Sequence, residues 1–187
     1  MYVIIKNGME MFKMMYAFDG HSPVIEEGAY VSETAIVIGD VVVGKGAYVG
    51  HGVILRGDYG RIEIGPETAV EEGVIVHAPP NDVCKIGKRV TLGHGAIIHS
   101  KEIKDFVVIG MGAVTSLGTV IGEYSIVAEG AVVKMNAQIP PKVVVAGSPA
   151  KEVRPVLERD TKLWSMGKQL YVDLAQKYLK IGMQRID

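Results

Sequence analysis

VVVGKGAYVGHGVIL, residues 41–55, decides the fold, because its apolar residues recur with a spacing of six. Val43, Val49 and Leu55 mark this repeat, and glycine follows the first two of them. An amphipathic helix needs a period near 3.6, which the stretch lacks. Six-residue repeats of this kind indicate a parallel β-helix, in which each unit forms one short strand and one turn.

The repeat extends over most of the chain, and three units are expected to form one triangular coil of about 18 residues. Its register breaks three times, with extra residues between Leu55 and Ile64 and between Val76 and Ile86, and one residue missing between Ile98 and Ile109. We expect these breaks to form loops at corners, where solenoids often carry functional residues. The repeat is marked by Val31, Val37, Val43, Val49, Leu55, Ile64, Val70, Val76, Ile86, Leu92, Ile98, Ile109, Thr115, Ile121, Val127 and Val133.

The repeat also sets the domain organisation. Residues 1–15 are predicted to be an N-terminal extension, residues 16–153 a β-helix domain and residues 154–187 a C-terminal helix. The helix is expected over 160–180, capped by Asp160 or Thr161 and packed against the outside of the solenoid. Its apolar face is predicted from Leu163, Gly167, Leu170, Leu174 and Tyr178.

Composition excludes several classes of protein. The formal net charge of −1 over 187 residues provides no basic face for nucleic acid. The apolar runs are too short to span a membrane, and the N-terminus lacks the pattern of a signal peptide. A single cysteine, Cys84, is typical of a reducing compartment, so we expect a cytoplasmic protein.

Large polar side chains occupy the position after the apolar residue at four central repeats, where glycine is usual: Arg56, Glu71, His77 and His99. Once the extra residues are subtracted, Arg56, His77 and His99 are one coil apart and form one column. The imidazoles of His77 and His99 are then about one strand spacing apart, close enough to bind one metal ion.

His94 falls outside this column, about one face of the triangle earlier and roughly 16 Å along the wall at ~3.3 Å per residue. A neighbouring subunit related by threefold symmetry would bring its His94 to the His77 and His99 pair. By the same arithmetic, Glu71 lies on the His94 side. The spacing therefore predicts metal sites shared between the subunits of a homotrimer.

Three further residues are assigned ordinary roles. His21 and His51 are interpreted as hydrogen-bonded surface residues. Cys84 lies in the second register break and is interpreted as a loop thiol, although its position would allow an approach to the metal.

Four motifs resemble the gamma-class carbonic anhydrase family: LRGDYGRIEIG, EEGVIVH, GHGAIIH and GSPAK. YAFDGHSPVI and LRGDYGR further resemble its carnitine-operon and phenylacetate-degradation branch. The resemblance implies a left-handed β-helix, a homotrimer and interfacial sites for Zn2+ or Fe2+, and three histidines would also suit Co2+. It implies that His77, His94 and His99 bind the metal, that Arg56 and Asp58 form an intersubunit ion pair, and that Tyr171 lies near the pocket.

The chain departs from the family at the site. Much of the family has Asn-x-Gln-Asp before the first ligand histidine, whereas this chain has Ala69, Glu71 and Glu72. The acidic loop that shuttles protons in a well-known archaeal member is also missing, since only Asp82 occurs in APPNDVCK. These differences bear on the rate of hydration and leave the three histidines in place.

The resulting hypothesis is hydration of carbon dioxide to bicarbonate by a metal-bound hydroxide, because a metal held by three histidines can lower the pKa of bound water to about 7. Glu71 is either the base that accepts the proton or the partner of a basic residue across the interface. The alternatives are hydrolysis of an acyl-CoA thioester, acyl transfer, and a non-catalytic metal-binding trimer.

Overall fold

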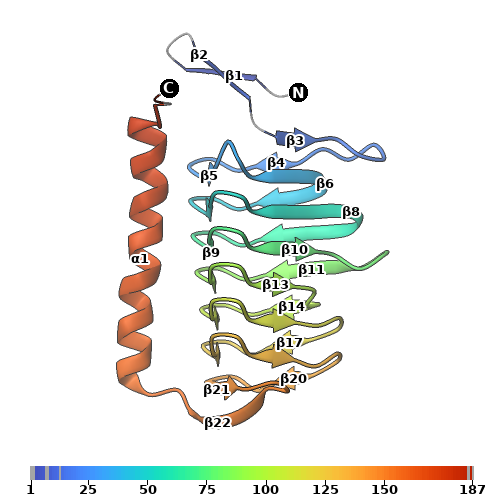
Figure 1. The fold of residues 1–187 in the computed structure, drawn as a ribbon, viewed down its shortest axis with the longest axis vertical. Helices are drawn as coiled ribbons and strands as arrows, with labels where there is room; N and C mark the ends of the chain where they lie inside the picture. Colours follow the sequence, from blue (N-terminus) through green and yellow to red (C-terminus); the bar gives the residue numbers. More distant parts are fainter. Residues whose placement is uncertain (1–2, 7–8, 13, 185, 187) are drawn as a thin grey trace.

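The protein, seen in a computed structural model, is described over residues 3–6, 9–12, 14–184 and 186. The chain winds into a stack of triangular coils, and one long helix, α1 (Glu158–Ile181), runs back along the stack (Figure 1). This is a left-handed parallel β-helix with a C-terminal helix, which confirms the predicted fold class. An antiparallel pair, β1 (Val3–Lys6) and β2 (Met9–Phe12), precedes the first coil.

The coils form three walls, which we call the first, second and third wall. The first wall contains β5 (Tyr30–Val31), β7 (Tyr48–Val49), β9 (Ala69–Val70), β12 (Thr91–Leu92), β15 (Val108–Ile109), β18 (Ile126–Val127), β21 (Val143–Ala146) and β22 (Lys151–Pro155). The second wall contains β3 (Met14–Tyr16), the first parts of β6 (Ile36–Val43) and β8 (Ile54–Ile64), β10 (Ile75–His77), β13 (Ile97–Ile98), β16 (Val114–Thr115) and β19 (Val132–Val133). The third wall contains β4 (Val24–Ile25), the second parts of β6 and β8, β11 (Val83–Ile86), β14 (Glu102–Ile103), β17 (Val120–Ile121) and β20 (Gln138–Ile139).

The six-residue repeat sets the core, since its apolar residues stack in columns from coil to coil. In the second wall Leu55 pairs with Val76, and Val76 pairs with Ile98. All three side chains are fully buried. The register predicted after subtraction of the extra residues is therefore confirmed.

Glycine after the apolar residue is explained by the close approach of neighbouring coils. A Cβ atom on Gly65 would lie 2.4 Å from the carbonyl carbon of Gly87 on the next coil. That distance is a steric clash with backbone, so a side chain at this position would push the coils apart. These glycines are therefore required by the contact between successive coils.

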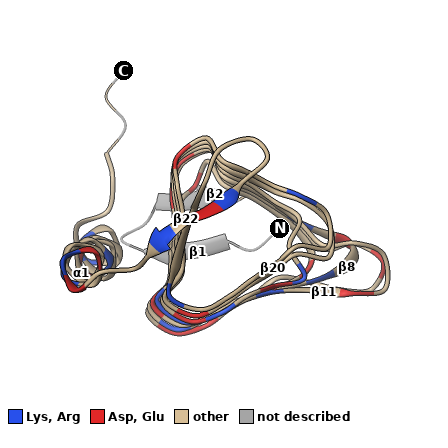
Figure 2. Cartoon of the chain, turned by 90° about the horizontal axis from the view of Figure 1, so that it is seen from below, with Lys and Arg blue, Asp and Glu red and all other residues tan. Residues whose placement is uncertain are grey.

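The prediction that the register breaks form loops is wrong for the first of them. β8 runs without interruption from Ile54 to Ile64 and pairs with β6 on both sides of an irregularity at Gly39 and Val41. Viewed along the axis, β8 and β11 extend outward at one corner of the triangle (Figure 2). The extra residues therefore bulge the corner while the strand continues around it.

Helix α1 begins at Glu158, so Asp160 lies inside the first turn and the predicted caps are wrong. The Asp160 carboxylate accepts the backbone N–H of Leu157 and pairs with Arg154. The predicted packing face is also partly wrong, because Leu163 and Leu170 are 64% and 69% exposed.

The face of α1 that does pack lies on the first wall (Figure 2). Tyr171, Leu174 and Tyr178 surround the buried Ala175 and contact Tyr30 and Tyr48. Aromatic residues point outward from β5 and β7 and need cover. The helix face that packs is therefore the one that covers these tyrosines, and Leu163 and Leu170 lie outside it.

Candidate metal centre

His77 and His99 lie side by side on neighbouring coils of the second wall. Their ring centroids are 5.0 Å apart with an interplanar angle of 62°. The preceding residues, Val76 and Ile98, are paired in register, and Arg56 pairs with His77 on the other side. The predicted column of Arg56, His77 and His99 is thus present, at the separation expected for adjacent strands.

Asp58 joins this column through contacts with two of its members. Its Oδ2 accepts a 2.7 Å hydrogen bond from Arg56 Nη1, and its Oδ1 lies 3.3 Å from Nε2 of His77. Burial opposes the ionised carboxylate, but the Arg56 guanidinium outweighs it and holds the pKa of Asp58 below its usual range. The Arg56–Asp58 pair forms within one chain, and its predicted intersubunit form stays a prediction.

Two observations bear on the predicted metal site. Nε2 of His77 and Oδ1 of Asp58 are both buried, and neither has a hydrogen-bond partner within the described part of the chain, despite their proximity. Burial, together with the nearby His77 and Arg56, lowers the pKa of His99, which favours the neutral imidazole that a metal requires. Imidazole nitrogens are ordinary ligands of zinc and iron.

His94 lies at the corner between β12 and β13, where two carboxylates surround its ring. Its Nε2 is 3.2 Å from Oε2 of Glu71, and its Nδ1 is 2.9 Å from Oε2 of Glu72. The side chain remains 46% exposed. The corner thus presents an oriented imidazole toward the outside of the chain, with Glu71 beside it as the sequence predicts.

Glu71 is almost entirely buried, with 6% of its surface exposed. Burial raises its pKa, while His94 and a hydrogen bond from the Tyr171 hydroxyl act in the opposite direction. Oε2 of Glu71 also accepts the backbone N–H of His94 at 3.2 Å. Tyr171, projecting from α1, therefore touches the same corner as His94.

A single chain does not bring the three histidines together. Across the described ranges 3–6, 9–12, 14–184 and 186, no group of three or more His, Cys, Asp or Glu side chains is placed to hold one metal ion. His77 and His99 lie at one corner of the triangle and His94 at another. One chain therefore offers two parts of the predicted ligand set at separate places.

Sequence reasoning missed Tyr48 and Lys168, and it named Glu72 only as a departure from the family. Tyr48 Oη donates a 2.7 Å hydrogen bond to Glu72. Lys168 of α1 is buried, and its Nζ donates to Thr91 Oγ1 and the Val107 carbonyl. The column arithmetic could have placed Tyr48 opposite Ala69 on the next coil, three residues before Glu72. Lys168 could not be found from the sequence, because its burial depends on which face of α1 packs on the solenoid.

The outward faces of the three walls differ in polarity and in whether helix α1 covers them. The first wall is covered by α1, and the third presents polar outward residues such as Glu63, Lys85 and Gln138. The second wall presents an apolar ladder that stays partly exposed among the described residues, and Ile75 and Ile97 within it are 37% and 40% exposed. This ladder, which we call the bare ladder, consists of Ile54, Ile75, Ile97, Val114 and Val132.

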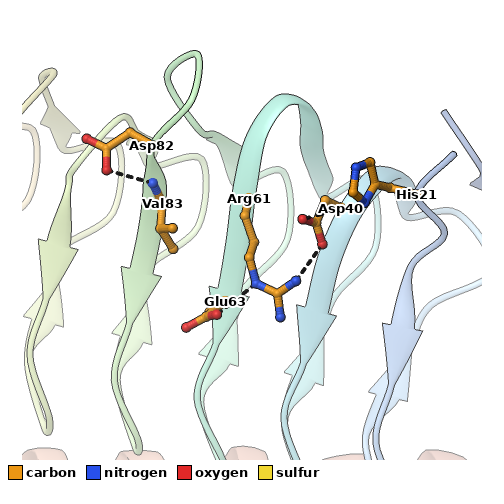
Figure 3. A network of polar contacts seen from close by, with 6 residues as sticks. All are labelled: His21, Asp40, Arg61, Glu63, Asp82 and Val83. Carbon is orange, nitrogen blue, oxygen red and sulfur yellow. Dashed lines mark hydrogen bonds and ion pairs between the residues drawn. The ribbon is translucent and has the colours of Figure 1, made fainter. Parts of the chain in front are cut away.

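A polar hollow adjoins Asp58 at the bulged corner. Figure 3 shows part of its lining, in which Arg61 donates to Asp40 at 2.8 Å and His21 faces Asp40. Arg61 also donates at 2.8 Å to Glu63, which does not line the hollow. Nearby, Asp82 accepts the backbone N–H of Val83. The hollow is lined by Asp19, His21, Asp40, Gly57, Asp58, Tyr59, Gly60, Arg61, Asn81, Asp82 and Val83.

The three residues that were predicted to have ordinary roles are Cys84, His51 and His21. Cys84 lies within β11 and is fully buried in the core, so its prediction as a loop thiol is wrong, and burial raises its pKa to about 12. His51 is hydrogen-bonded to Ser32 Oγ at 2.6 Å, as expected for a satisfied surface residue. His21 is exposed and lies 3.8 Å from Asp40.

The fold and the six-residue repeat define a hexapeptide-repeat β-helix protein. The chain belongs to the family that contains the gamma carbonic anhydrases and the carnitine operon proteins CaiE. It is 38% identical over 160 residues to the carnitine operon protein CaiE of Proteus sp., spanning 86% of this chain and 81% of that protein.

Further similarities agree with this family. The chain is 36% identical to gamma carbonic anhydrase 2, mitochondrial, of Arabidopsis thaliana over 87% of its own length, and it spans 60% of that relative. A crystal structure of a hexapeptide transferase family protein from Anaplasma phagocytophilum matches with a TM-score of 0.84 at 30% identity, covering 89% of this chain and 98% of that one. No family model matches the chain. Among the described residues, no helix combines the length and the apolar character needed to cross a membrane.

Proposed function

We propose that the protein is a homotrimer that hydrates carbon dioxide to bicarbonate at metal centres shared between subunits. The observation that carries the proposal is the pairing of His77 and His99 beside Asp58, with His94 held at a different corner. Membership of a family that includes gamma carbonic anhydrases supports the same reaction.

The bare ladder supports the assembly. Exposed apolar patches on a protein surface commonly mark interaction sites. The ladder runs along the second wall, two residues before the column of Arg56, His77 and His99 in each coil. A neighbouring copy that covers the ladder would bring its own surface to the histidine pair, and His94 of that copy completes the ligand set.

The proposed ligands are His77 and His99 of one subunit and His94 of the next, and Zn2+, Fe2+ or Co2+ suits this donor set. When bound, such a metal acts as a Lewis acid and lowers the pKa of water to about 7. Asp58 places a negative charge beside His77, and Arg56 holds Asp58 in its ionised form. These roles are consistent with the 3.3 Å and 2.7 Å contacts described above.

Glu71 is proposed to accept the proton released from the attacking water. Its carboxylate lies beside His94 and is almost buried, and burial raises its pKa toward the range in which a general base works best. Tyr171 hydrogen-bonds this carboxylate and so sets its orientation. The alternative that Glu71 pairs with a basic residue across the interface predicts no effect on proton transfer.

Hydrolysis of an acyl thioester is a second candidate, and the polar hollow beside Asp58 favours it. Carbon dioxide needs no space of this kind, whereas an acyl or carrier group would need a site next to the reacting atoms. The similarity to a hexapeptide transferase family protein points in the same direction. Transfer without a metal is less well supported, because it leaves the three histidines without a role.

The test is complementation between two inactive variants. His94→Ala and His99→Ala are each expected to form trimers without activity. When equal amounts are co-expressed, about a quarter of the interfaces should combine an intact His94 with an intact His99, and hydration measured by stopped flow should return to about that fraction. A site formed within one chain would give no recovery. The same samples, assayed with acyl-CoA thioesters, separate the two candidate reactions.

The compartment is also part of this proposal. A single buried cysteine suits the cytoplasm. The two Arabidopsis relatives are mitochondrial by name, and that statement applies to those proteins.

A further inference from the structure

We propose that Glu72, held in place by Tyr48, is the positioning residue that fixes the tautomer of His94. This inference rests on the proposed function, since it names the residue that prepares the third ligand. Glu72 is not itself a ligand or a catalytic residue in this proposal. It acts on the metal centre only through His94.

The first step is the contact between the two side chains. Oε2 of Glu72 lies 2.9 Å from Nδ1 of His94, within range of a charge-assisted hydrogen bond. A metal-binding histidine commonly donates its other ring N–H to a carboxylate, which fixes the tautomer and the orientation of the ring. A proton on Nδ1 leaves the lone pair of Nε2 free to bind a metal.

The second step is that Glu72 is itself held rigidly. Its other carboxylate oxygen, Oε1, accepts a 2.7 Å hydrogen bond from the Tyr48 hydroxyl. Tyr48 is buried, with 2% of its surface exposed, and packs against Tyr171 and Tyr178 of α1 at centroid distances of 5.2 Å and 6.2 Å. Docking of α1 therefore fixes the carboxylate that orients His94.

The third step distinguishes Glu72 from Glu71. Glu71 lies on the Nε2 side of His94, at 3.2 Å, where the metal is expected. Its Oε2 is also engaged by the backbone N–H of His94. Glu71 is therefore placed to act next to the metal, while Glu72 occupies the opposite nitrogen. The two adjacent glutamates therefore contact opposite nitrogens of the His94 ring and have different roles.

The first measurement is the tautomer of His94 in the metal-free protein. NMR of protein labelled with 15N-histidine resolves five histidines, and the His94→Gln variant identifies the His94 signal. We expect the proton on Nδ1 in the wild type at pH 8 and a shift toward Nε2 in Glu72→Gln. A proton on Nε2 in the wild type overturns the proposal, whether or not the protein is an enzyme.

The second measurement is Zn2+ affinity, determined by competition with a chelator. Glu72→Gln is expected to lose about 10–100-fold in affinity, as for other residues that orient metal ligands. Tyr48→Phe should lose less, and the double variant should lose no more than Glu72→Gln, because Tyr48 acts through Glu72. Additive losses of Zn2+ affinity in the double variant would contradict the proposal that Tyr48 acts through Glu72.

Tyr30→Phe is the matched control, since Tyr30 stacks on Tyr48 in the same cluster at 5.5 Å. It removes a hydroxyl from the cluster and leaves the Tyr48–Glu72 hydrogen bond intact. Both tyrosine variants are expected to lower the melting temperature, but only Tyr48→Phe should weaken Zn2+ binding. Equal Zn2+ affinity in Tyr30→Phe and Tyr48→Phe would reduce Tyr48 to a packing role.

The two proposals can fail separately. If the wild type binds Zn2+ and His94→Ala does not, but Glu72→Gln binds as the wild type does, only the positioning role fails. If no variant or wild-type sample binds Zn2+, Fe2+ or Co2+, the proposed function fails, and the tautomer measurement still decides the role of Glu72.

Discussion

The rings of His77 and His99 lie 5.0 Å apart on successive coils, because Val76 and Ile98 directly before them are paired in register. The β-helix places these two imidazoles together whatever their separation along the chain. Three protein ligands are usual in a catalytic zinc site. Under the proposed function, the geometry of one wall supplies two of these ligands and another surface supplies the third.

Replacing either histidine of this pair should abolish stable metal binding. His77→Ala and His99→Ala are each expected to lose at least about 100-fold in Zn2+ affinity, more than the loss of a residue that only orients a ligand. Metal content after dialysis and chelator competition measure this. His51→Ala is the control, since His51 is hydrogen-bonded to Ser32 away from the column. Full Zn2+ occupancy in His99→Ala would contradict the ligand assignment.

Charging the bare ladder should prevent assembly and, with it, metal binding. Ile97→Lys places a charge in an apolar surface that we expect the neighbouring subunit to cover, and burying an unpaired charge is very costly. Analytical ultracentrifugation is expected to show monomers that retain the β-helix signal in circular dichroism. Gln138→Lys on the polar third wall is the control and should remain trimeric. A trimeric Ile97→Lys protein would place the interface elsewhere.

The sequence was sufficient for the columns and insufficient for the helix. Steric repetition fixes which residues share a column, so the pairing of Arg56 with His77 follows from counting alone. The docked face of α1 depends on Tyr30 and Tyr48, which belong to a different part of the chain. Helical spacing carries no information about the surface that the helix packs on, so it predicts Leu163 and Leu170 on the packed face, whereas both are exposed.

The same distinction explains the site residues. Glu71 was predicted beside His94 because both positions follow from the repeat. The extra residues before Cys84 predict a loop, whereas β11 already pairs with β8 at Val83, so Cys84 lies in a strand. Lys168 was missed, since its burial requires a contact between α1 and the first wall that no local pattern encodes.

Glu71→Gln should separate proton transfer from metal binding. If Glu71 accepts the proton, hydration is expected to fall about 100-fold or more, with Zn2+ affinity little changed. Burial raises the pKa of Glu71 above its ordinary value of 4.5, so wild-type activity should decline with falling pH through that raised pKa, and the variant should lack this limb. Glu67→Gln, which alters an ion pair with Arg89, is the control. Unchanged or faster hydration in Glu71→Gln would rule out the base role.

Lys168 should make stability depend on pH in the alkaline range. Burial, with Arg89 nearby, lowers its pKa from 10.5 to about 7, while Glu71 acts in the opposite direction. Between these two values the unfolded chain binds the proton and the folded chain does not, so stability rises with pH across the window. Below pH 7 Lys168 is protonated in both the folded and the unfolded chain, so the folded protein bears the full free-energy cost of burying its charge.

Lys168→Met should remove this dependence. The difference in free energy of unfolding between the variant and the wild type is expected to be largest below pH 7, and to shrink by at most about 1.4 kcal/mol per pH unit above it. Denaturant titrations from pH 6 to pH 10 at one fixed protein concentration measure this difference. Lys162→Met, at an exposed position of the same helix, is the control and should run parallel to the wild type. Parallel curves for Lys168→Met and the wild type would mean that Lys168 keeps its proton in the folded protein.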